Sequence, residues 1–121
     1  MPFVLLWCKA FALTLALELP IAARLLRGQP GALVGRRLAA VLVANLASHP
    51  AVWFVFPELG TNSAAILVVS ELWAFVSEAA IYRLIFAGPP PLPWRRAILV
   101  SGVANAISFL VGKAFASLLF R

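Results

Sequence analysis

The sequence predicts an all-α integral membrane protein, a four-helix bundle built from two helical hairpins that repeat in parallel. Three observations predict it. The 121 residues are 64% hydrophobic and 12% charged, with a mean hydropathy of +1.01. The apolar residues fall into four long runs, and the two halves of the chain match after a shift of 60 positions. A soluble chain this short could not bury so much apolar surface, so we expect lipid to cover it.

Each apolar run has the length of a membrane span. A hydrocarbon core of about 30 Å requires roughly 20 helical residues. The runs predict helices over 3–26, 38–56, 64–86 and 97–120, in a single transmembrane domain of residues 1–121. The connectors are short and rich in Gly and Pro, so successive helices are expected to run antiparallel. The first residues lack the basic segment of a secretory signal, and we expect no cleaved leader.

The basic residues predict the orientation in the membrane. Seven of the ten lie around the first and third connectors, the arrangement of the positive-inside pattern. They are Arg24, Arg27, Arg36, Arg37, Arg83, Arg95 and Arg96. We expect these arginine-rich loops to be cytoplasmic and both termini outside, in a bacterial inner membrane. Anionic lipid headgroups explain the positive charge more simply than a nucleic acid, so the lipid bilayer is the expected partner and no nucleic acid is expected.

The two halves of the chain, residues 11–56 and 71–116, predict an internal duplication. The polar matches carry the argument, because alanine and valine match by chance in such a composition. They are Glu18 with Glu78, Asn45 with Asn105, and Ser48 with Ser108. Each repeat has two spans, so both enter the membrane the same way round, about an axis along the membrane normal. Two similar hairpins with chance matches are the alternative.

Four of these polar residues fall at one depth. Glu18, Asn45, Glu78 and Asn105 each lie seven or eight residues inside the arginine-bearing end of their predicted span. This is roughly 11–12 Å at 1.5 Å per residue. Ionisable groups at bilayer depth are costly and usually face the bundle interior. We therefore expect one polar layer, which is either a proton or cation site or a set of interhelical bonds that only hold the helices together.

Further polar residues lie on the outer side of this layer. Ser48 and Ser108 join the candidate substrate- or ion-binding set with His49, whose imidazole can pass protons between the outer surface and the layer. The alternative for His49 is a structural ring bonded to a backbone carbonyl. Glu71 and Lys113 have no polar equivalent in the other repeat, and we expect them to form an outer polar pair.

Metal binding and catalysis have weaker signals. Glu18, Glu78 and His49 would suit a hard or borderline divalent metal ion, but no ligand spacing such as H-E-x-x-H supports one. No nucleophile elbow, phosphate loop or dinucleotide fingerprint occurs, and adjacent helical residues such as Ser48 and His49 point about 100° apart. The sequence leans against an enzyme and indicates no cofactor. The single cysteine, Cys8, excludes an internal disulfide.

Three short segments carry a resemblance to known proteins. ELPI at 18–21, NLASHPAVWF at 45–54 and VANAIS at 103–108, together with Glu78, resemble an uncharacterised family of small four-helix bacterial inner-membrane proteins. That resemblance implies a fold but no activity. The glutamate in the first of four spans is also similar to that of the small multidrug-resistance transporters, although here a second glutamate lies in the same chain. The Gly-rich Asn motif of fluoride channels is not found.

These patterns predict a small transporter or channel-like protein that handles protons, cations or a small solute at the Glu/Asn layer. One alternative is a non-transporting accessory or assembly subunit of a larger membrane complex. Another is a membrane-embedded metal-binding or lipid-modifying protein. Four spans leave little room for an enclosed pore, so the expected protein partners are further copies of the chain or other membrane subunits.

Overall fold

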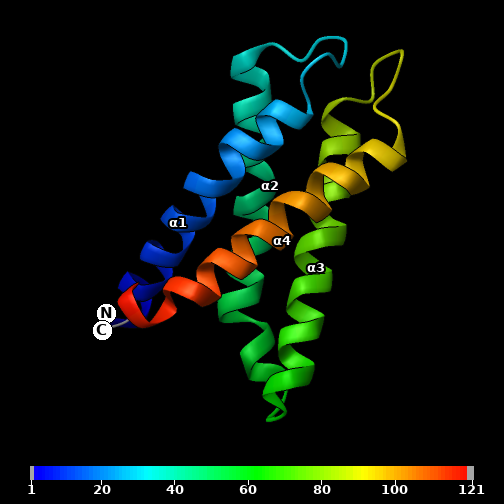
Figure 1. Ribbon diagram of the computed structural model, residues 1–121. Helices are drawn as coiled ribbons and strands as arrows, with labels where there is room; N and C mark the ends of the chain where they lie inside the picture. Colours follow the sequence, from blue (N-terminus) through cyan, green and yellow to red (C-terminus); the bar gives the residue numbers. More distant parts are fainter. Residues whose placement is uncertain (1, 120–121) are drawn as a thin grey trace.

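Four long helices make up most of residues 2–119, the part of the chain that the computed structural model describes (Figure 1). They are α1 (Pro2–Leu25), α2 (Val34–Phe54), α3 (Ser63–Ile85) and α4 (Trp94–Leu119), with a short 3-10 helix η1 (Phe56–Leu59) between α2 and α3. Within this range there is no strand. Each long helix is apolar and long enough to cross a membrane, so the all-helical, four-span prediction is confirmed.

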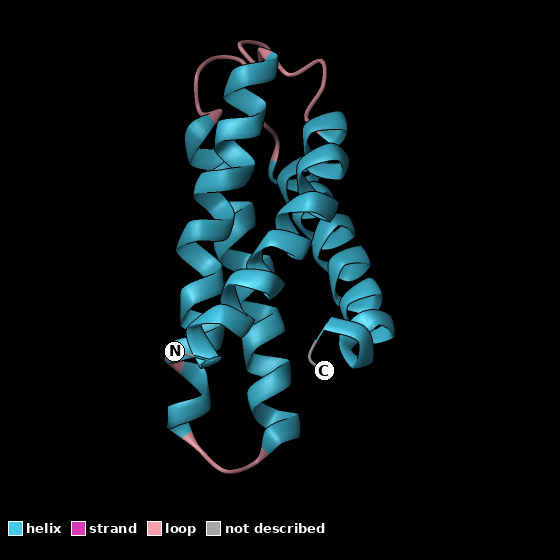
Figure 2. Ribbon diagram, turned by 90° about the vertical axis from the view of Figure 1, so that its left-hand side faces the viewer, coloured by secondary structure: helices cyan, strands magenta, loops and turns pink. Residues whose placement is uncertain are grey.

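The helices pack as a closed ring. Each contacts its neighbours in sequence, and α4 returns to pack on α1. The α1–α2 and α3–α4 connectors lie together at one end of the bundle, which we call the connector end (Figures 1 and 2). Both termini and the α2–α3 turn lie toward the opposite end, which we call the terminal end. Toward the terminal end, α1 stays packed on α2, since Phe3 contacts Trp53 and Phe54, while α4 diverges from α3 (Figure 1).

Two helices begin earlier than the apolar runs predict. Helix α2 begins at Val34 and not at residue 38, and α4 begins at Trp94 and not at residue 97. Each additional turn holds two arginines, which a boundary drawn from hydropathy leaves in the connector. Arginine is nevertheless a good helix former, so the helix continues through these residues.

Arginines in these additional turns cap the helices of the opposite hairpin. Arg36 donates to the carbonyl of Ile85, the last residue of α3, at 2.5 Å. Arg96 donates to the carbonyl of Leu25, the last residue of α1, at 2.8 Å through Nη2 and 3.2 Å through Nε. Carbonyls in the last turn of a helix have no intrahelical partner, and a cation there is also favoured by the helix dipole. The two contacts therefore stabilise both helix ends in the same way.

Large side chains close the interior at the connector end. Leu26, Tyr82, Phe86 and Leu92 are at most 1% exposed and pack in one apolar cluster. Leu92 also ties the second connector back to α3, because its backbone N–H donates to the carbonyl of Phe86 at 2.8 Å. This cluster, which we call the connector-end plug, separates the helix interior from the arginine-bearing connectors.

The first connector turns on two glycines. Gly28 and Gly31 have φ angles of +87° and +75°, a backbone conformation that side chains with a Cβ rarely adopt. Between them, the buried Gln29 donates from its side chain to the carbonyl of Pro90 at 2.9 Å. This bond joins the first connector to the second and holds the two hairpins together at this end.

Candidate functional site

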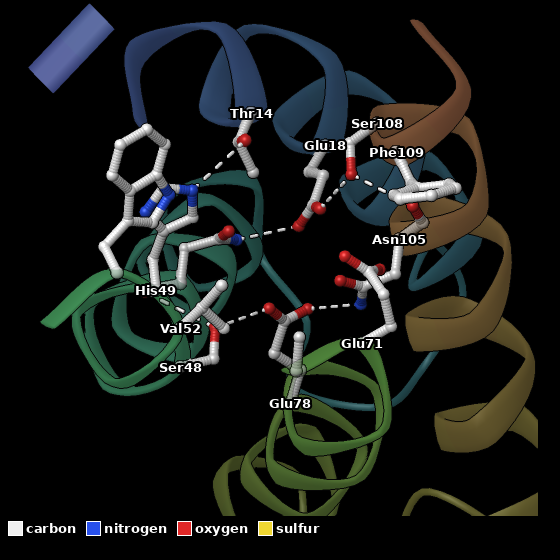
Figure 3. Close-up of a pocket in the computed structure, with 13 residues that line it drawn as sticks. Thr14, Glu18, Ser48, His49, Val52, Glu71, Glu78, Asn105, Ser108 and Phe109 are labelled. Atoms are coloured by element: carbon white, nitrogen blue, oxygen red, sulfur yellow. Dashed lines mark hydrogen bonds between the residues drawn. The ribbon is translucent and has the colours of Figure 1, made fainter. Parts of the chain in front are cut away.

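Glu18 of α1 points into the space between the four helices, where two donors hold its carboxylate (Figure 3). Its side chain is fully buried. Asn45 Nδ2 of α2 donates to Oε2 at 2.9 Å, and Ser108 Oγ of α4 donates to Oε1 at 2.8 Å. Each carboxylate oxygen therefore has one donor, and each donor comes from a different helix.

Glu78 of α3 faces the same space from the other hairpin and is held in the same way (Figure 3). Asn105 Nδ2 donates to its Oε2 at 2.8 Å, and Ser48 Oγ donates to its Oε1 at 2.7 Å. Each glutamate thus accepts from the asparagine of its own hairpin and from the serine of the other hairpin. The structure brings together all six of these residues, which the sequence placed in one candidate set.

Backbone contacts fix the two asparagine amides. Asn45 Nδ2 also donates to the carbonyl of Val41 at 3.0 Å, and Asn105 Nδ2 to the carbonyl of Ser101 at 2.9 Å. In each case the acceptor lies one turn back along the same helix. The other amide atom of Asn45, Oδ1, is buried and accepts no hydrogen bond within the described chain.

Ser101 belongs to this network, although it is not among the candidate residues predicted from the sequence. Its hydroxyl donates to the carbonyl of Phe75 on α3 at 2.7 Å and lies 3.2 Å from Asn105 Nδ2. The one usable signal is its position four residues before Asn105, on the same helix face. The equivalent residue in the first repeat is Val41, so the repeat does not extend to this contact.

Among residues 2–119, His49 bonds to side chains of α1 and to no backbone carbonyl. Trp7 Nε1 donates to His49 Nδ1 at 3.0 Å, and Thr14 Oγ1 lies 3.5 Å from Nε2. The ring also stacks against Trp53 with an interplanar angle of 19°, and Phe11 meets it edge-on. Trp7 and Thr14 are seven residues apart and share a helix face, but the sequence could not show that this face meets His49.

Glu71 and Lys113 line one cavity on the terminal side of the polar layer. The Lys113 ammonium lies over the ring of Phe109, 5.6 Å from its centroid, within the range of a cation–π contact. The same lysine is exposed toward the terminal end. Direct pairing of Glu71 with Lys113 stays a prediction.

The carboxyl groups surround a cavity of about 120 Å³, which has room for several water molecules. Glu18, Glu71 and Glu78 all line it (Figure 3), and no Lys or Arg is among the described residues that do so. A second cavity of about 360 Å³ continues it toward the terminal end. This second cavity, which we call the vestibule, shares lining residues such as His49 and Phe109 with the first and takes side chains from all four helices.

The proposed metal ligands do not form a metal site. Within residues 2–119, no three His, Cys, Asp or Glu side chains come close enough to share an ion. His49 uses its ring nitrogens on Trp7 and Thr14, so it does not join Glu18 and Glu78 as a ligand.

Comparison with known protein families, with characterised proteins and with solved structures finds no match for this chain. The polar layer and its two cavities are therefore the features that point to a function.

Proposed function

We propose that this protein is a small integral membrane transporter for protons or a small cation, with Glu18 and Glu78 as the carboxyl pair that binds it. One observation carries the proposal: three carboxyl groups line a cavity of about 120 Å³, and no Lys or Arg is among the described residues that line it. In a low-dielectric interior, uncompensated carboxylates are costly, so a cation or bound protons would stabilise the cavity.

The hydrogen bonds support a binding role for the two glutamates. Each carboxylate oxygen accepts one bond from Asn or Ser, and an ionised carboxylate offers about four lone-pair sites in all. The donors thus orient both groups and leave acceptor capacity for a guest. A carboxylate oriented in advance loses less entropy when the guest binds.

Access to the cavity differs at its two ends. Toward the terminal end the vestibule leads to it, while the connector-end plug, which contains Leu26, Tyr82 and Phe86, covers the other side. A transporter must open each side in turn, so in this proposal the plug opens during the cycle. The divergence of α4 from α3 toward the terminal end fits a state that is open on that side (Figure 1).

We infer that the chain is a four-helix bundle made by duplication, with repeats over 11–56 and 71–116. Three pairs of contacts related by 60 positions support this. They are the Asn45–Glu18 and Asn105–Glu78 bonds, the Ser48–Glu78 and Ser108–Glu18 bonds, and the Arg36–Ile85 and Arg96–Leu25 caps. Chance matches between two hairpins would not be expected to reproduce contacts at both the polar layer and the helix ends.

In the proposed orientation, the connector end lies on the cytoplasmic side of a bacterial inner membrane and both termini lie on the outer side. Arg24, Arg27 and Arg95 are exposed at the connector end, where they would meet anionic headgroups. Glu58 lies exposed on η1 at the opposite end. With this orientation the vestibule opens to the outside.

The test is a flux measurement in proteoliposomes with the combined substitutions Glu18→Gln and Glu78→Gln. We expect the proton or cation flux of the double variant to fall at least about tenfold, as is typical when a group essential to a reaction step is removed. Glu58→Gln is the matched control, because it removes a carboxylate that lies outside both cavities. If the double variant transports as fast as the control, the two glutamates are not the binding pair.

A specific observation also favours the alternative of an assembly subunit. All four carboxylate oxygens already have donors from the same chain, which a purely structural layer would also show. Native mass spectrometry after gentle extraction from the membrane separates the two functions. A homo-oligomer or monomer free of other chains supports the transporter, and a stable set of foreign chains supports the subunit.

A further inference from the structure

We propose that the cation bound here is the ammonium form of an amine that has N–H donors and an apolar body. The inference rests on the proposed function and names its substrate class. The ammonium head would lie among Glu18, Glu78 and Asn45, and the apolar body would extend into the vestibule along Phe109.

The unpaired oxygen of Asn45 points to a guest that donates hydrogen bonds. Asn45 is 0% exposed, it lines the cavity, and its Oδ1 has no donor within residues 2–119. Rotating the amide would not remove the problem of the missing donor, because Nδ2 already donates to both Glu18 and the carbonyl of Val41 and would lose these bonds. An unsatisfied buried acceptor costs about 1–3 kcal/mol. An ammonium N–H at this position would satisfy Oδ1 and the free lone pairs of the carboxylates together.

Hard metal ions fit the cavity less well. Calcium takes six to eight oxygen ligands and magnesium demands a near-octahedral set. Three glutamates line the cavity, but no three acidic or imidazole side chains of residues 2–119 are grouped so that they could hold one metal ion. The ring nitrogens of His49 are engaged with Trp7 and Thr14. An ammonium group needs only two or three acceptors, which Asn45 and the two glutamates supply.

The aromatic lining favours an organic cation. His49, Trp53 and Phe109 line the same cavity as the carboxylates. The face of Phe109 already holds an ammonium group, since Lys113 Nζ lies 5.6 Å from the ring centroid. A cation over an aromatic face gains about 0.5–2 kcal/mol, more when it is desolvated. A guest amine on the cavity side would use the same class of contact.

The vestibule can take the apolar body. It measures about 360 Å³ and is continuous with the cavity through shared lining residues. Ala10, Leu13, Leu67 and Ala116 give it an apolar wall toward the terminal end. A short alkyl or aryl group would bury its surface there while the charged head lies at the glutamates. This polarity gradient matches an amphiphilic amine better than a bare inorganic ion.

Isothermal titration calorimetry in nanodiscs tests the inference with two probes that share one alkyl chain. Butylammonium has N–H donors, and butyltrimethylammonium has the same charge and chain without them. We expect butylammonium to bind at least about tenfold more tightly, the factor for roughly one hydrogen bond to a charged group. Equal affinities, or tighter binding of the trimethylated probe, would overturn the N–H recognition.

Two single variants move the affinity for butylammonium in opposite directions. Phe109→Leu keeps the site apolar but removes the ring, and we expect binding about fivefold weaker. Lys113→Met removes a competing positive charge from the same ring, and we expect binding about fivefold tighter. A misfolded variant would not bind more tightly, so the second result cannot arise from damage. Glu58→Gln should bind like the unchanged protein.

The result also separates this inference from the proposed function. Proton flux that depends on Glu18 and Glu78, without any binding of butylammonium, overturns the amine proposal and keeps the transporter. Binding of butylammonium without any proton or cation flux keeps the site and overturns transport. If a correctly folded preparation shows neither flux nor binding, both the amine proposal and the transporter proposal are overturned.

Discussion

The Ser108 hydroxyl of α4 donates a 2.8 Å hydrogen bond to the Glu18 carboxylate of α1, across 90 positions of the sequence. Ser48 makes the equivalent bond to Glu78 at 2.7 Å. Each hairpin therefore needs the serine of the other to satisfy its own glutamate. Because each glutamate takes one of its two donors from the opposite hairpin, the polar layer is complete only when both hairpins are packed together.

This relationship predicts energetic coupling between Ser108 and Glu18. Ser108→Ala and Glu18→Met, made singly and together, should show a coupling free energy of about 0.6–1.7 kcal/mol, the range for interhelical hydrogen bonds in membranes. The free energy of unfolding can be measured by titrating SDS into mixed micelles. Ser77→Ala is the control for the serine, since Ser77 donates to the carbonyl of Trp73 in its own helix. Coupling of Glu18 to Ser77 as large as to Ser108 would contradict the prediction.

The arginine caps predict unequal effects at two adjacent positions. Arg96→Ala should lower the free energy of unfolding by about 1–2 kcal/mol, because the carbonyl of Leu25 loses a charged donor. Arg95→Ala, next to it and exposed, should stay within about 0.5 kcal/mol. Arg96→Lys should fall between them, since lysine keeps the charge but loses the two-nitrogen fork. If Arg95→Ala and Arg96→Ala lower the free energy of unfolding equally, the cap does not account for the effect at position 96.

The Trp7–His49 contact predicts the tautomer of the imidazole. His49 Nδ1 accepts from Trp7 Nε1, so the neutral ring carries its proton on Nε2 and donates toward Thr14. Nitrogen-15 NMR can read this directly, because His49 is the single histidine of the chain. Trp7→Phe should move the spectrum toward a mixture of tautomers, and Trp94→Phe at an exposed site should not. A protonated Nδ1 in the unchanged protein would contradict the assignment.

The spans and the polar layer could be predicted because both depend on distances along single helices. The length of an apolar run determines whether it can cross a bilayer, and a count of residues from the run's end gives the depth of Glu18 or Asn45. The 60-position shift then matched Ser48 with Ser108 as equivalent residues of the two repeats. These predictions needed no knowledge of how one helix is rotated against another.

The rest depends on helix rotation, which spacing alone does not determine. Sequence reasoning could not show that Trp7 meets His49, or that Ser101 bonds to the carbonyl of Phe75 on α3. The predicted start of α2 was also too late. A boundary drawn from hydropathy leaves Arg36 in the connector, although this arginine lies in the helix and caps α3. Contacts between helices and the termini of helices thus needed the structure.

A final prediction concerns Tyr82 in the connector-end plug. Its hydroxyl is buried one turn from Glu78 and has no hydrogen-bond partner within residues 2–119. The equivalent residue in the first repeat is Ala22, which is also fully buried. The aromatic ring of Tyr82 therefore has no counterpart in the first repeat. If the plug is dry, Tyr82→Phe should leave the free energy of unfolding unchanged or raise it by about 1 kcal/mol, because it removes a desolvated polar group.

The matched variant is Tyr82→Ala, which should cost about 3–5 kcal/mol because it leaves a cavity in the plug. Both values can be obtained by the same SDS titration. A loss of more than about 1 kcal/mol for Tyr82→Phe would show that the hydroxyl has a partner, and a water molecule beneath the glutamates is the simplest one. The plug would then be a hydrated route between Glu78 and the connector end, not a seal, and the transport cycle would need a smaller movement to open it.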